Sequence, residues 1–229
     1  MTRARVLGVA SLAGVALLLL TACGPDAPAP TGTPTGPTSG PSASATPTPE
    51  PLVRPALGDL ALGADGFAQL PLGQVPTTDP LVAMVTFDAA ACDGNGVWNA
   101  DGSYISTDPD AYGPGTAFTV TAGPGSNGAL TRIDLNTFDI PTDAGIRIGS
   151  TRAEVVAAYA GATVQPMGLT EVFVIEGQVG LLQIEVASDA EYWAGFRPNG
   201  TVVYIHASLP DQGVFSVAAS ENVLGICFA

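Results

Sequence analysis

The chain has 229 residues, with 21 acidic residues, seven arginines and no lysine, and its formal net charge is −14 at pH 7. A surface this acidic repels phosphate groups, so the composition excludes binding to nucleic acid and electrostatic binding to anionic lipid headgroups. A single histidine cannot supply the usual zinc ligands, and the sequence has no phosphate-binding glycine loop, dinucleotide fingerprint or Cys-x-x-Cys motif. We therefore expect no cofactor.

Residues 1–22 have the layout of a secretory signal. Arg3 and Arg5 precede an uncharged apolar run at 6–20, and small residues follow it. The run is shorter than the roughly 20 residues that a membrane-spanning helix needs, which disfavours a transmembrane anchor. Removal of residues 1–22 leaves five arginines against 21 acids, a side-chain charge near −16.

The apolar run ends in Leu20-Thr21-Ala22-Cys23, which resembles the lipobox of bacterial lipoproteins. In that family the cysteine thiol receives a diacylglyceryl group, and cleavage frees an amine that is acylated with a fatty acid such as palmitate. The resemblance implies that Cys23 is lipidated and holds the mature protein at the cell membrane, on the extracytoplasmic side. The alternative is an ordinary signal peptide that precedes Cys23 by chance.

Residues 23–55 predict a lipidated cysteine followed by a disordered linker. Ten of the 32 residues at 24–55 are proline, and most of the others are small or hydroxylated. Such a segment buries too little apolar surface to offset the entropy of ordering it. The folded extracytoplasmic domain is therefore expected at 56–229, with 56–128 and 129–229 as candidate halves.

Strand patterns dominate the expected domain. Residues 129–135 and 181–186 alternate between apolar and polar side chains, and 192–197 with 201–207 flank an Asn-Gly turn that predicts a hairpin. The pattern predicts an α+β fold, an antiparallel β-sheet with one or two short helices packed on one face. The predicted strands are 118–121, 129–135, 171–176, 181–186, 192–197, 201–207 and 223–228, and the predicted loops are 93–102, 108–115 and 123–128.

Two helices are predicted. Thr151 and Glu154 form a Thr-x-x-Glu capping box at the start of the first helix. A second helix is predicted at 79–91, because Asp79-Pro80 gives an N-cap followed by proline at the first helical position. The apolar face of the first helix is predicted to be Val155, Val156 and Tyr159, and Gly161 is predicted to end it.

Residues 145–155, Gly-Ile-Arg-Ile-Gly-Ser-Thr-Arg-Ala-Glu-Val, resemble the strand-turn-helix start of small bacterial lipoprotein modules. These are the SmpA/OmlA-type and β-lactamase-inhibitor-like modules, and actinobacterial lipoproteins that carry two such units. In them antiparallel strands follow the helix. Residues 65–73 echo the motif, which indicates a two-unit internal repeat. The resemblance implies partner binding, because those modules bind rather than catalyse.

The two remaining cysteines form one pair. Cys23 is assigned to the lipid, which leaves Cys92 and Cys227 in an exported, oxidising compartment. We expect a disulfide that ties the C-terminal strand to the first half of the domain. A metal-binding or catalytic thiol is the alternative.

One loop has side chains that suit a hard cation. Asp93, Asn95, Asn99 and Asp101 offer oxygen atoms separated by glycines, as a Ca²⁺ site requires. The spacing departs from that of an EF-hand loop. A glycine-rich turn, in which Asx side chains bond their own backbone, is the favoured alternative.

The other candidate residues form no marked catalytic constellation. His206 shares a strand face with Val202 and Tyr204, and this face is predicted to meet solvent or a groove. Trp98 and Trp193 suit sugar stacking, although core packing is the commoner use of a lone tryptophan.

The sequence therefore favours a non-catalytic module of the cell envelope that binds a protein or a wall component through a face of its sheet. One alternative is a wall-acting hydrolase, because 21 acids provide carboxylate pairs without marked spacing. The other is a small lipoprotein that binds a solute or a metal.

Overall fold

The computed structural model describes residues 53–92, 96–106, 115–123 and 127–218. The chain divides into two units, Met1–Thr48 and Pro49–Ala229, and every described residue belongs to the second. The predicted signal peptide, Cys23, nearly all of the linker and the predicted strand at 223–228 lie outside the described residues. Within the described ranges, no helix is long and apolar enough to cross a membrane.

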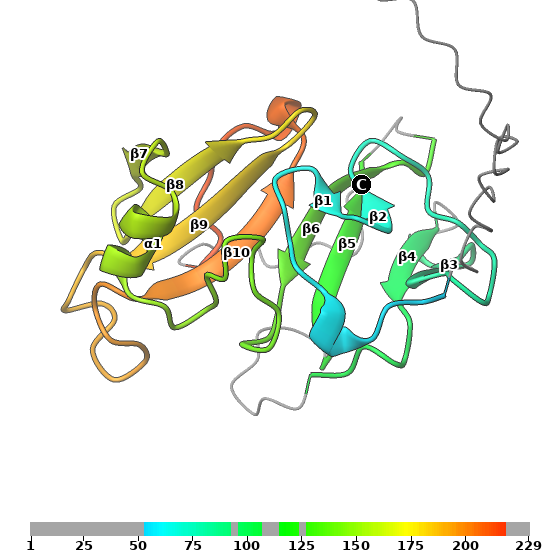
Figure 1. Ribbon diagram of the computed structural model, residues 1–229, viewed down its shortest axis with the longest axis horizontal. Coiled ribbons are helices and arrows are strands. Elements are labelled where there is room, and N and C mark those ends of the chain that lie inside the picture. Colours follow the sequence, from blue (N-terminus) through cyan, green and yellow to red (C-terminus); the bar gives the residue numbers. More distant parts are fainter. Residues whose placement is uncertain (1–52, 93–95, 107–114, 124–126, 219–229) are drawn as a thin grey trace, which may run out of the picture. The chain divides into compact units, whose positions relative to one another are not determined.

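Six antiparallel strands form the main sheet, in the order β5-β6-β10-β9-β8-β7 (Figure 1). The pairs β1–β2 and β3–β4 form two smaller antiparallel sheets. The described fold is thus mostly antiparallel β-structure with one short helix. The elements are β1 (Gly66–Phe67), β2 (Leu70–Pro71), β3 (Val85–Asp88), β4 (Val97–Ala100), β5 (Phe118–Ala122), β6 (Leu130–Leu135), α1 (Arg152–Ala158), β7 (Thr163–Pro166), β8 (Thr170–Glu176), β9 (Leu181–Ala187) and β10 (Val202–Ser208), with 3-10 turns at Leu57–Asp59 and Pro210–Gln212.

One face of the main sheet is apolar and carries the core. Ile133 of β6, Ile184 of β9 and Ile205 of β10 are fully buried in one cluster. Val155 of α1 and Phe67 of β1 belong to the same cluster, so the helix and the β1–β2 hairpin cover this face (Figure 1). Each buried aliphatic side chain of this size contributes about 1.5–3 kcal/mol. The alternation in β9 and β6 therefore separates an apolar face from a polar one.

Five of the seven predicted strands form within one residue of their expected bounds, as β5, β6, β8, β9 and β10. The predicted capping box also forms, because the Thr151 hydroxyl accepts from the Glu154 amide and the Glu154 carboxylate accepts from the Thr151 amide. The helix is shorter than expected, with its C-cap at Tyr159. Val155 is buried as predicted, but Val156 is 42% exposed, so its place on the apolar face was wrong.

The second predicted helix, at 79–91, is wrong. The Asp79 carboxylate accepts from the Leu81 amide at 3.0 Å, and this cap is followed by a single turn. Residues 85–88 then form β3, which pairs with β4 at 97–100 inside a segment predicted to be a loop. Phe87 lies opposite Trp98 with ring centroids 5.0 Å apart, so a cross-strand aromatic pair outweighs the helical signal of the cap.

The predicted strand at 192–197 is also wrong. Backbone hydrogen bonds between Ala187 and residues 200–201 close the β9–β10 hairpin directly, which leaves 188–199 as its connection. Within that connection the Asp189 carboxylate accepts from the amides of Glu191 and Tyr192, and turns follow. The Asn-Gly turn precedes β10 but does not join it to a strand at 192–197.

Candidate functional site

The second face of the main sheet is polar and almost completely buried. Strand register brings its side chains together, because His206 of β10 lies opposite Asp134 of β6 and Gln183 of β9, while Tyr204 lies opposite Glu185. We call this set the polar face. Its members are Arg132, Asp134, Gln183, Glu185, Tyr204 and His206, none more than 7% exposed.

Asp134 and Arg132 form a buried ion pair on this face. Arg132 Nε donates to Asp134 Oδ1 at 2.7 Å, and the Tyr204 hydroxyl donates to the same oxygen at 3.3 Å. Burial nevertheless raises the pKa of Asp134 to about 6, because lost hydration outweighs the Arg132 charge and the hydrogen bonds from Arg132 and Tyr204. This carboxyl therefore titrates close to neutral pH.

Glu185 binds the segment 213–218, which we call the strap. Glu185 accepts from the Ser216 hydroxyl at 2.6 Å and from the amides of Val217 and Ala218 at 2.6 and 3.3 Å. Burial raises the pKa of the Glu185 carboxyl, although these three hydrogen bonds and the Arg132 charge each lower it. The carboxylate is thus a fastening point for the strap.

Two further side chains bind the strap. Gln183 Nε2 donates to the Gly213 carbonyl at 3.1 Å, and Gln183 Oε1 accepts from the Phe215 amide at 3.2 Å. The Phe215 ring stacks on the His206 ring, with centroids 4.8 Å apart, and the Arg132 guanidinium lies 4.8 Å from its centroid. The strap therefore covers the polar face and contributes to its burial.

Several polar atoms of this region are buried with unmet hydrogen-bonding capacity. Among the described residues, they include both ring nitrogens of His206, Asp134 Oδ2, both side-chain polar atoms of Asn136 and Thr119 Oγ1. Thr119 lies opposite Asp134, so these atoms form a continuous strip across three strands. Each such atom costs about 1–3 kcal/mol when buried without a partner. Burial also lowers the pKa of His206 well below its usual range, as does the Arg132 charge.

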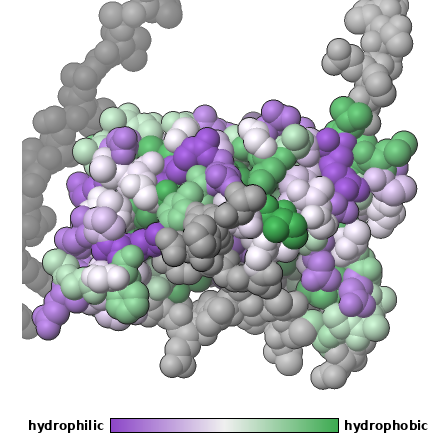
Figure 2. All heavy atoms as spheres, turned by 90° about the horizontal axis from the view of Figure 1, so that it is seen from below, coloured by the Kyte–Doolittle hydropathy of each residue, from purple (hydrophilic) through white to green (hydrophobic). Residues whose placement is uncertain are grey.

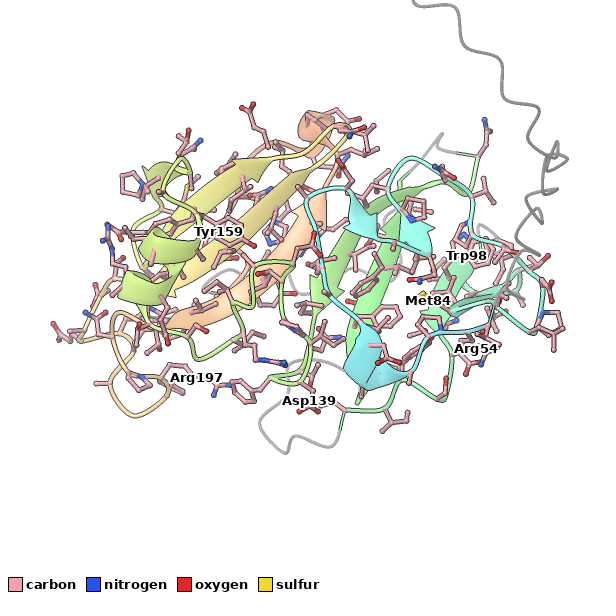
Figure 3. The ribbon with its side chains drawn as sticks, in the orientation of Figure 1. Arg54, Met84, Trp98, Asp139, Tyr159 and Arg197 are labelled. Carbon is pink, nitrogen blue, oxygen red and sulfur yellow. The ribbon has the colours of Figure 1, made fainter. Side chains whose placement is uncertain are left out.

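The 188–199 connection presents aromatic side chains to solvent. Trp193 is buried and donates from Nε1 to the Leu169 carbonyl at 2.7 Å, which fixes the connection on the domain. Tyr192 is 46% exposed and Phe196 is 77% exposed. A hollow of about 410 Å³ lies along 190–199, and the Arg197 guanidinium, labelled in Figure 3, lies 4.6 Å from the centroid of the Phe138 ring.

Figure 2 shows hydrophilic and hydrophobic residues mixed over the coloured part of one molecular face, which is ordinary for a protein surface.

A second hollow, of about 370 Å³, is lined by acidic and small residues that include Asp59, Asp65 and Asp143. The Asp65 carboxylate accepts from the amides of residues 178, 179 and 180 at 2.8–3.1 Å. These bonds, the one from Val179 first, hold the pKa of Asp65 below its usual value. Asp65 thus fastens the N-terminal segment to the β8–β9 turn. The described residues contain no group of three or more His, Cys, Asp or Glu that could hold a metal ion.

The predicted cation loop is described only in part. Asp93 and Asn95 lie outside the described residues, and Asn99 is exposed in β4. The Asp101 carboxylate accepts from the Ser103 amide and hydroxyl and pairs with Arg54 at 2.6 Å. The hydrogen bonds from Ser103 and the Arg54 charge lower the pKa of Asp101. The calcium site remains a prediction.

The structure describes other predicted site residues as follows. Cys92 is disulfide-bonded, but Cys227 lies outside the described residues, so their pairing remains a prediction. Trp98 and Trp193 are buried and donate from Nε1 to backbone carbonyls, which leaves neither ring as an open platform for a sugar. His206 does share a face with Tyr204, but this face is buried, and a register shift separates Val202 from it.

Of the side chains that make the polar face, the sequence singled out only His206 with Tyr204 on one strand face, and not the four from β6 and β9. Arg132 with Asp134 and Gln183 with Glu185 are alternate residues of two predicted strands, a pattern that ordinarily marks a solvated face. The missing information is that β10 lies between β6 and β9, which brings both pairs to His206. Polar residues at alternate positions of three strands were the available signal.

No protein-family model matches the chain, and no curated protein matches it. Among solved structures, the chain is similar to the crystal structure of the uncharacterized protein yfeY from Escherichia coli, with a TM-score of 0.35 and 18% sequence identity. The alignment covers 65% of this chain and 99% of that chain. A TM-score this low does not establish a shared fold.

Proposed function

We propose that the protein is a lipoprotein anchored through Cys23 on the extracytoplasmic side of the membrane, and that its domain is a non-catalytic binding module of the cell envelope. Residues 24–55 act as the linker, and the domain binds a partner protein through the polar face. The resemblance of residues 20–23 to a lipobox supports the anchor.

One observation carries the binding role. Gln183 and Glu185 hold the strap by its backbone, with four hydrogen bonds to atoms of residues 213, 215, 217 and 218. A sheet face that binds a peptide segment in this way has the chemistry needed to bind a protein. Its titratable groups lie beneath the strap, whereas general acid–base catalysis needs such groups within hydrogen-bond reach of a substrate.

A pull-down from detergent-solubilised envelope tests the proposal. The mature chain carries an affinity tag in the linker, and partners are retained by the wild type, a Gln183→Ala variant and a Phe196→Ser variant. We expect a saturable partner that Gln183→Ala loses and Phe196→Ser keeps, because Phe196 lies on the 188–199 connection. Loss of the partner only in Phe196→Ser would move the binding site to that connection, and no retained partner would contradict the proposal.

A wall-acting hydrolase is the second candidate, and one observation favours it. Asp134 and Glu185 are buried carboxyls with raised pKa values on one sheet face, a feature common among catalytic acids. A panel of wall glycan and peptide substrates separates the candidates. Turnover by the wild type that Asp134→Asn or Glu185→Gln abolishes would replace the binding role with catalysis.

The two-unit repeat is part of this proposal and remains a prediction. Residues 66–71 contribute the β1–β2 hairpin, but β3 stands where the first unit was expected to have its helix. We infer that, if the repeat is present, the unit with α1 is the complete one and carries the binding face.

A further inference from the structure

Side chains rather than the edge of the sheet hold the strap. Along β9, Gln183 contacts residues 213 and 215 of the strap, and Glu185 contacts the later residues 216–218. The strap therefore runs across the polar face in the same direction as β9. Gly213, with φ of 74°, turns the chain into this path after the 3-10 turn at Pro210–Gln212.

The bonds from Gln183 and Glu185 to the strap are mostly to backbone atoms. Gln183 binds the carbonyl of residue 213 and the amide of residue 215, which brackets Val214 much as a neighbouring strand would. Glu185 binds the amides of residues 217 and 218. Backbone contacts of this kind recognise an extended peptide with little regard to its sequence.

Two side chains of the strap add a sequence requirement. Phe215 stacks on His206 and lies against Arg132, so this position favours an aromatic residue. The Ser216 hydroxyl lies 2.6 Å from Glu185 Oε2 and 2.8 Å from Thr170 Oγ1, so the next position favours serine or threonine. Val217 is buried, so the third position favours an apolar residue.

The strap does not supply hydrogen-bond partners for every buried polar atom of the polar face. His206 is fully buried beneath Phe215, yet neither of its ring nitrogens has a hydrogen-bond partner among the described residues. Asp134 lies opposite His206 on β6, and its Oδ2 atom is also buried without a hydrogen-bond partner in the described part of the chain. The strap therefore leaves part of the hydrogen-bonding capacity of the polar face unused.

We propose that the polar face is a receptor for an extended peptide with an aromatic–Ser/Thr–apolar sequence, and that residues 213–218 occupy it as an internal ligand which a partner's segment displaces. This inference rests on the proposed function, since it names the partner class for the same face. The displacement needs no strand of the main sheet to separate.

A peptide supplied in trans tests the inference. The probe is a fluorescent peptide with the sequence of residues 209–218, Leu-Pro-Asp-Gln-Gly-Val-Phe-Ser-Val-Ala, and the control is a scrambled peptide of equal composition. We expect the full mature chain carrying Phe215→Ala to bind the probe at least tenfold more tightly than the wild type, because its own strap competes less. Adding Gln183→Ala to that variant removes the binding, and Phe196→Ala alone leaves the wild-type affinity unchanged.

Hydrogen exchange supplies a readout that survives a poorly folded variant. In the wild type, saturating probe is expected to accelerate exchange at the amides of residues 215, 217 and 218 while β8, β9 and β10 stay protected. Unchanged exchange with saturating probe, or no probe binding by a folded Phe215→Ala chain whose strap amides exchange freely, would overturn the inference. A partner retained in the pull-down without any peptide binding would refute the inference and leave the proposed function standing.

Discussion

Asp134 shows how burial and pairing compete at a single residue. Its pKa is about 6 in the folded chain, against an ordinary 3.8, although Arg132 pairs with it. The folded state therefore binds more protons than the unfolded state between these two values. For this group alone, stability is greatest at low pH and falls as the pH rises through about 6.

Replacing Asp134 by asparagine tests that sign. Asparagine cannot ionise, so Asp134→Asn removes the proton uptake of this carboxyl from the pH dependence of the free energy of unfolding. The free energy of unfolding of the wild type, relative to that of Asp134→Asn, should be about 1 kcal/mol higher at pH 5 than at pH 7. Only the wild type gains stability as its carboxyl takes up a proton. Urea unfolding at both pH values measures this difference. An equal difference at the two pH values would show that Asp134 titrates normally.

His206 should act in the opposite direction. Burial lowers the pKa of His206. Below about pH 6.5 the imidazole is therefore protonated in the unfolded chain while it stays neutral in the folded chain. The wild type therefore loses stability through this group as the pH falls. His206→Gln should be relatively more stable at pH 5 than at pH 7 when compared with wild type in the same urea titrations. A difference in free energy of unfolding between wild type and His206→Gln that stays constant with pH would contradict this prediction.

At the scale of elements, the sequence predicted strands with core-forming alternation well. Apolar and polar residues alternate along most of β6, β9 and β10, and such periodicity is local information. It could not predict β3, where an aromatic contact between Phe87 and Trp98 across 11 residues outweighs the capping signal of Asp79. Nor could it predict that the polar face is buried, because that depends on the order of β6, β10 and β9 in the sheet.

The capping box is the local signal that the fold uses most directly. Thr151→Ala removes the hydroxyl that accepts from the Glu154 amide. We expect a loss of about 1 kcal/mol in the free energy of unfolding, the usual cost of an N-cap. Val156→Ala, in the same helix at a partly exposed position, is the matched control and should cost less. If both variants lose the same stability, the cap contributes nothing special.

At the scale of the whole molecule, a long-range link joins the N-terminal segment of the domain to the β8–β9 turn. Asp65 binds residues 178–180, more than 110 positions away in the chain. A Cys92–Cys227 disulfide would close an even longer loop, of about 136 residues, worth up to roughly 5 kcal/mol on the loop-entropy model. The disulfide is predicted from the expected compartment and from the two cysteines that remain after Cys23, whereas the Asp65 link had no sequence signal.

Removing the disulfide should therefore lower stability sharply. Cys92→Ser with Cys227→Ser is compared with wild type by thermal unfolding, each with and without reductant. We expect a large fall in Tm for the variant, and a matching fall for wild type only when it is reduced. Mass spectrometry of the oxidised protein should find Cys92 and Cys227 in one linked peptide pair. A Cys92 linkage to any other cysteine would reject the assignment.

The proposed lipid anchor at Cys23 would determine where the domain operates. Cys23→Ala should release the chain from the membrane fraction, because the acidic mature domain has no electrostatic attraction to anionic lipid and the predicted lipid supplies the attachment. Labelling cells with a clickable fatty acid should mark the wild type and leave Cys23→Ala unmarked. Cys92→Ser is the matched control, since it also removes one thiol, and it should remain labelled and membrane-bound. A Cys23→Ala chain that stays in the membrane fraction, or a wild type without label, would mean that residues 20–23 are not a lipobox and that the partner must be sought among secreted components.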